Sequence, residues 1–71
     1  MNAETASITA NGKVEQVRLP CSVTEFLAGC GWRPTQVVVE LNGQVLARSD
    51  LERSPLAAGD RLEIIVPVAG G

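Results

Sequence analysis

Two short runs of alternating apolar and polar residues stand near the start of the chain, residues 7–10 and residues 14–19. Such alternation is typical of strands that bury one face. Asn11 and Gly12 join the runs, and both residue types tolerate the positive φ angles of a type I′ turn. Pro20 ends the second run because it has no N–H to donate to a sheet. The pattern therefore predicts a β-hairpin.

After Pro20 the apolar residues no longer recur at every second position but at the spacing of a helix. Ser22 and Glu25 form a capping box, in which each side chain accepts a hydrogen bond from the other residue's backbone N–H. Gly31 suits the left-handed position after a helix, and Pro34 prevents continuation. Between these signals, four apolar residues at i, i+3, i+4 and i+7 predict one buried stripe: Val23, Phe26, Leu27 and Cys30.

A second hairpin is predicted from a β-prone run over residues 37–41, a turn at Asn42 and Gly43, and a return over residues 44–46. Residues 61–66 alternate again and form the last predicted strand. Two hairpins, one helix between them and a final strand indicate an α+β fold. We expect a mixed sheet of about five strands with one main helix packed on one face. The final strand can lie parallel to the first, between the hairpins, which is the β-grasp (ubiquitin-like) arrangement.

The length of 71 residues allows one domain. We expect a single domain over residues 1–66, with residues 1–6 as a disordered leader, and a flexible C-terminal tail over residues 67–71. The net charge is −2 and charges are scattered, so nothing favours nucleic acid or an anionic membrane as a partner. The apolar runs are too short to cross a bilayer. A cytoplasmic protein that is monomeric on its own is expected.

Catalytic groups are scarce in this composition. The chain has no histidine and no tyrosine, which excludes a Ser-His-Asp relay and histidine-based metal sites. Cys21 and Cys30 are too few for a four-ligand metal site, and we expect both to be reduced and packed as small hydrophobes. The carboxylates fall on predicted caps, turns and exposed faces. No catalytic residue and no metal site is therefore predicted, and the chain is not expected to be an enzyme.

The C-terminus is the candidate for chemistry. After Pro67 the chain ends in small residues, and Ala69, Gly70 and Gly71 can thread a narrow channel where branched side chains would clash. Residues 67–71 reach at most about 17 Å. An α-carboxyl group has a reference pKa of about 3.5 and is ionised at neutral pH, so the C-terminal carboxylate must be activated before it reacts. Adenylation with ATP and Mg²⁺ would activate it, and a partner enzyme must supply both.

Several segments of the chain match the pattern of a known family. They are Asn11-Gly12, Thr24-Glu25-Phe26-Leu27, residues 37–43, Arg48-Ser49, residues 56–64 and residues 68–71. Through these segments the sequence from residue 8 to residue 71 resembles the ThiS family, the sulfur carriers of thiamine biosynthesis. Many members end in three glycines, and Ala69 takes the first of these places here. The absence of an aromatic residue before the terminal glycines favours this family over molybdopterin-type carriers.

The resemblance implies a reaction sequence. A ThiF-like adenylating enzyme forms an acyl adenylate at Gly71, and sulfur from a cysteine desulfurase or another donor then gives a thiocarboxylate. Thiazole synthase accepts that sulfur. Val68, Ala69 and Gly70 would thread the partner's active site, and the chain itself would bind no cofactor, because the adenylating partner uses the ATP and Mg²⁺.

Recognition by these partners would use the surface of the fold. Val38 and Ile65 are predicted to point outward from the sheet, as are Glu40 and Glu63. We expect Val38 and Ile65, with Val68, to form part of a docking patch; the alternative is that they are merely tolerated apolar residues on the surface.

Three other functions remain open. The chain could carry sulfur for another pathway, such as molybdopterin synthesis. It could be a ubiquitin-like modifier, although Lys13 is its only lysine. It could also be a β-grasp interaction domain with an inert tail.

Overall fold

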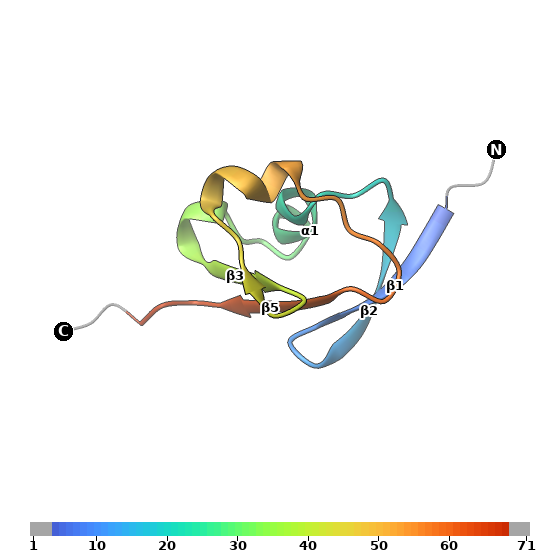
Figure 1. Ribbon diagram of the computed structural model, residues 1–71, viewed down its shortest axis with the longest axis horizontal. Coiled ribbons are helices and arrows are strands. Elements are labelled where there is room, and N and C mark those ends of the chain that lie inside the picture. Colours follow the sequence, from blue (N-terminus) through green and yellow to red (C-terminus); the bar gives the residue numbers. More distant parts are fainter. Residues whose placement is uncertain (1–3, 69–71) are drawn as a thin grey trace.

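The computed structural model describes residues 4–68 of the chain. These residues form one mixed sheet in the order β2-β1-β5-β3-β4, with helix α1 on one face (Figure 1). No helix in this range is long and apolar enough to cross a membrane. The elements are β1 (Glu4–Ala10), β2 (Lys13–Leu19), α1 (Val23–Gly29), β3 (Val38–Leu41), β4 (Gln44–Val45) and β5 (Arg61–Ile65), with 3₁₀ turns at Pro34–Gln36 and Arg48–Arg53.

Strand β5 joins the two hairpins. It lies parallel to β1, with Arg61 beside Thr9, and antiparallel to β3, with Ile65 opposite Val38. The hairpins themselves are antiparallel, and their turns contain Asn11 and Asn42 with positive φ angles, as the type I′ turns require. The predicted β-grasp arrangement, with the last strand between the hairpins, is therefore confirmed.

The first strand is longer than the sequence pattern predicted. It begins at Glu4, which pairs with Leu19 at the far end of β2, and Ala6 is buried in the core. The prediction of a disordered leader over residues 1–6 is therefore wrong from Glu4 onward, while residues 1–3 lie outside the described part. The reason is that β2 offers partners along its full length, and a small alanine completes the apolar face of β1.

Both predicted ends of the helix are present. The Glu25 N–H donates to Ser22 Oγ at 3.1 Å, and the Ser22 N–H donates to Glu25 Oε1 at 2.9 Å. At the other end Gly31 has φ +87°, which lets the Trp32 N–H donate to the Leu27 carbonyl at 2.9 Å. These bonds satisfy backbone groups that a helix end otherwise leaves without partners.

The core lies between α1 and the inner face of the sheet. Leu51, from the second 3₁₀ turn, and Leu56, from the loop that follows, are also buried there. No polar or charged residue within residues 4–68 is buried. Five apolar side chains are almost wholly enclosed: Ile8, Val23, Leu27, Val39 and Leu62.

The two cysteines have different surroundings. Cys21 packs partly against the core, and burial, followed by the nearby carboxylate of Glu25, raises the pKa of its thiol. Cys30 is exposed, so the prediction that it packs as a small hydrophobe is wrong. The helix ends at Gly29 and Cys30 is its C-cap, where the chain turns away before the apolar stripe reaches its fourth position.

Shortening a core side chain of α1 should lower the stability of the domain. We expect Leu27→Ala to lower the free energy of unfolding by about 2–5 kcal/mol, because it opens a cavity that the small core can only partly fill. Urea denaturation measures this loss. The matched control is Val45→Ala, at a side chain that is 65% exposed, and it should change stability by less than about 0.5 kcal/mol. Equal losses in the two variants would contradict this assignment of the core.

The two thiols should also react at different rates. The thiolate is the form of cysteine that reacts, and the raised pKa of Cys21 gives it a smaller thiolate fraction than an ordinary cysteine has at the same pH. The exposed Cys30 should therefore be alkylated first by iodoacetamide at mildly alkaline pH. Raising the pH should narrow the difference. Peptide mass mapping over time measures both rates, and the same reaction in denaturant is the control, where the two rates should converge. Faster labelling of Cys21 in the folded protein would refute the expectation.

Candidate functional site

The tail begins where β5 ends. Val66, Pro67 and Val68 follow the strand directly and run away from the body of the molecule, and Val68 is 90% exposed (Figure 1). The predicted reactive residue, Gly71, lies outside the described residues, as do Ala69 and Gly70, so their roles stay predictions. What the structure establishes is the root of the tail, which is the end of a central strand and not of a loop.

Two of the predicted docking residues lie side by side at that root. Val38 and Ile65 are register partners on β3 and β5, with exposed fractions of 38% and 45%. Their chain neighbours Val39 and Ile64 face the core, so the alternation of the strands turns Val38 and Ile65 to the opposite face. The structure thus brings these two together, with Ile65 three residues before the exposed Val68, and their role in docking stays a prediction.

A pair of like charges occupies the next position on the same face. Glu40 and Glu63 lie directly opposite each other on β3 and β5. Like charges placed opposite each other destabilise a sheet. The ion pair found within residues 4–68 joins Arg53 to Asp50 at 3.4 Å, on the surface of a 3₁₀ turn. Neither glutamate of the pair therefore has a cationic partner within 4.0 Å among the described residues.

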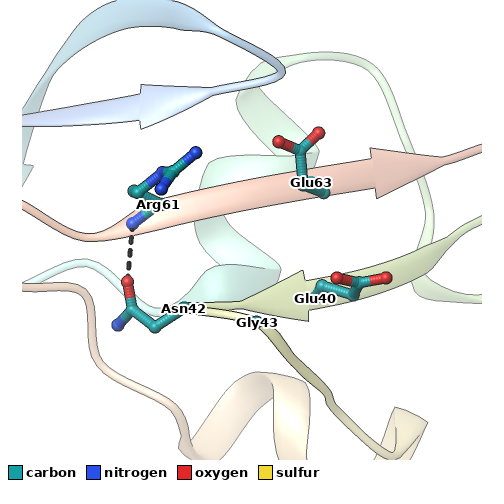
Figure 2. Close-up of a pocket in the computed structure, with 5 residues that line it drawn as sticks. All are labelled: Glu40, Asn42, Gly43, Arg61 and Glu63. Atoms are coloured by element: carbon teal, nitrogen blue, oxygen red, sulfur yellow. Dashed lines mark hydrogen bonds between the residues drawn. The ribbon is translucent and has the colours of Figure 1, made fainter.

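An open hollow lies beside this acidic pair, on the outer side of β3 and β5 (Figure 2). The carboxamide of Asn42 is already engaged there, because its Oδ1 accepts from the Arg61 N–H at 2.9 Å and its Nδ2 donates to Asp60 Oδ1 at 3.0 Å. These two bonds hold the Asn42 carboxamide in place at the edge of the hollow. Its lining consists of Glu40, Asn42, Gly43, Arg61 and Glu63.

The described residues bring no other chemical groups together. Between residues 4 and 68 no cluster of three or more histidine, cysteine, aspartate or glutamate side chains could hold a metal ion. The thiol with the raised pKa, Cys21, lies just before α1, and its Sγ donates to the Ser22 carbonyl at 3.4 Å. The described part of the chain thus offers an outer sheet face with exposed apolar and acidic side chains, and the root of a tail.

One residue with a clear role at this root was not singled out by the sequence pattern. Asn11 was predicted only as a turn residue, yet its side chain bonds to both backbone groups of Ile64 in β5. The signal available in the sequence was its place at the end of a strand that neighbours β5. A hairpin signal alone does not reveal which way the asparagine side chain points.

The comparisons agree with this architecture. The ThiS family model matches residues 1–71. The crystal structure of a thiamine biosynthesis protein (ThiS) from Geobacter metallireducens is 34% identical, with a TM-score of 0.77 over 92% of this chain and 99% of that one. A solution structure of a thiamine biosynthesis protein from the same organism is also 34% identical, with a TM-score of 0.75 over 92% of this chain and 87% of that one. No curated protein matches. A family match over the whole chain and likeness at this level show that the chain belongs to the ThiS family.

Proposed function

We propose that this chain is a sulfur carrier of thiamine biosynthesis, which holds its sulfur as a thiocarboxylate at Gly71. Membership of the ThiS family supports the proposal, as does likeness to two structures of thiamine biosynthesis proteins. The observation that carries it is the exposed stretch of residues 66–68 directly after β5, which another protein can reach. The fold then serves as the handle and the tail as the reactive arm.

The chemistry follows from the terminal carboxylate. A ThiF-like enzyme uses ATP and Mg²⁺ to convert it to an acyl adenylate with release of pyrophosphate, because an ionised carboxylate is a poor electrophile. The persulfide of a cysteine desulfurase or another donor then displaces AMP, and a thiol reduces the resulting acyl disulfide to the thiocarboxylate. Thiazole synthase accepts the sulfur. The chain is a co-substrate throughout, and its partners bind the cofactors.

The outer face of β3 and β5 is the docking surface in this proposal. It consists of Val38 and Ile65 at the root of the tail, the acidic pair Glu40 and Glu63 beside them, and the exposed Val68 beyond. Burial of the valines and the isoleucine would stabilise a complex by about 25 cal/mol for each Å² removed from water. A cationic side chain of the partner would relieve the repulsion between the two glutamates. The surface therefore fits a partner that presents a cation surrounded by apolar groups.

The transfer chemistry is tested by intact mass. After incubation with ATP, Mg²⁺, the adenylating enzyme and a persulfide donor, the protein should gain the mass of one sulfur in place of one oxygen, located at Gly71 by fragmentation. Gly71→Val is the matched control, because it keeps the carboxylate but adds a branched side chain, and it should remain unmodified. An unchanged wild-type mass, or sulfur located on Cys21 or Cys30, would rule the proposal out.

The docking surface is tested by placing a charge in it. Ile65→Asp should raise the KM of the adenylating enzyme for the carrier at least about tenfold, because the complex loses the burial of one large apolar side chain. Val14→Asp is the matched control, since Val14 is 67% exposed on the distant strand β2, and it should leave KM unchanged. Far-UV circular dichroism verifies that both variants fold. If Ile65→Asp keeps the wild-type KM, the docking surface lies elsewhere.

A further inference from the structure

The backbone pairing between β1 and β5 ends before β5 itself does. Register pairs join Thr9 to Arg61 and Ala10 to Leu62, and the Asn11 N–H donates to the Leu62 carbonyl at 2.9 Å. At Asn11, which has φ +51°, the chain turns into the hairpin. The last residues of β5 therefore have no main-chain partner on the β1 side from the register of that strand.

Beyond that point the side chain of Asn11, in place of a backbone group of β1, bonds to the backbone of β5. Its Oδ1 accepts a hydrogen bond from the Ile64 N–H at 2.7 Å, and its Nδ2 donates to the Ile64 carbonyl at 3.2 Å. A carboxamide carries the same C=O and N–H groups as a peptide unit, so it can act as the next peptide unit of β1. Ile64 is thereby held from the β1 side by Asn11, while Val39 is its register partner in β3.

The two bonds between Asn11 and Ile64 lie at the root of the tail. Ile64 and Ile65 are the last residues of β5, and Val66 and Val68 beyond them are exposed. Gly71 is the seventh residue after Ile64, which corresponds to at most about 25 Å of extended chain. A change in the direction of the chain at Ile64 therefore changes where Val66 and Val68, the first exposed valines beyond β5, lie relative to the sheet.

We propose that Asn11 is a positioning residue for the tail. Its carboxamide fixes the root at Ile64, so that the chain leaves the sheet in one direction relative to the surface formed by Val38 and Ile65. The inference rests on the proposed function for what the tail delivers, while the fixation itself is a property of the chain alone. Asn11 touches no substrate in this role and acts through the backbone of β5.

The other hairpin offers a matched control. Asn42 has nearly the same backbone conformation, with φ +52°, and its Oδ1 also accepts from a backbone N–H of β5, that of Arg61 at 2.9 Å. Arg61 is the first residue of β5, at the end of the strand away from the tail. Glycine at either position keeps the positive φ that the turn needs, so Asn11→Gly and Asn42→Gly remove comparable bonds at opposite ends of one strand.

The first experiment uses the carrier alone and compares amide exchange and ¹⁵N relaxation. In Asn11→Gly we expect the Ile64 amide to exchange at least about fivefold faster, since loss of a hydrogen bond changes a local opening constant by about that factor. The order parameters of Val66 and Val68 should fall. In Asn42→Gly the Arg61 amide should exchange faster, while Val66 and Val68 keep their wild-type values. Wild-type order parameters at Val66 and Val68 in Asn11→Gly would overturn the proposal.

The second experiment measures adenylation at a temperature where every variant is folded. Asn11→Gly should lower kcat about fivefold with KM within about twofold of wild type, because the tail is misdirected while the docking surface is intact. Asn42→Gly removes a side chain that borders the acidic pair of the docking surface, so its KM is not part of the comparison, but it should keep the wild-type kcat. Equal kcat values in the two variants would reduce Asn11 to a structural role and overturn the proposal. If the wild-type protein is not adenylated at all, the proposed function fails, and the relaxation comparison still decides whether Asn11 fixes the tail.

Discussion

The double pairing of β5 is the constraint on which the other features depend. Because this strand is bonded to β1 on one edge and to β3 on the other, its register cannot shift without breaking both ladders. A shift of one residue would place Leu62 in water and Ile65 in the core. The same pairing therefore determines which side chains fill the core, which form the outer face, and where the tail begins.

Local signals in the sequence predict much of this fold. The Asn-Gly turns, the capping box of Ser22 and Glu25, and the left-handed Gly31 each depend on neighbours in the sequence, so they can be recognised there. The order of the strands was obtained by analogy with the β-grasp arrangement, because periodicity does not say which strands are neighbours. The outward direction of Val38 and Ile65 followed from the alternation of the strands, and the structure confirms it.

The errors arose where long-range packing decides. Ala6 belongs to the sheet because β2 is long enough to pair with it, and a single alanine among polar residues gives little sign of this. Cys30 has the spacing of a buried residue, yet the cap ends the helix before the spacing can take effect. The bonds from Asn11 to Ile64 join residues 53 positions apart, and no pattern within either segment indicates them.

The position of β5 also has a mechanical consequence. A pull on the chain beyond Ile65 would act along the axis of β5, which pairs with β3 over four residues and with β1 over its first two residues, so several hydrogen bonds would share the load as shear. An edge strand pulled sideways would instead unzip one bond at a time. If an enzyme binds the C-terminal tail and pulls on it, the sheet can therefore bear that force without unfolding.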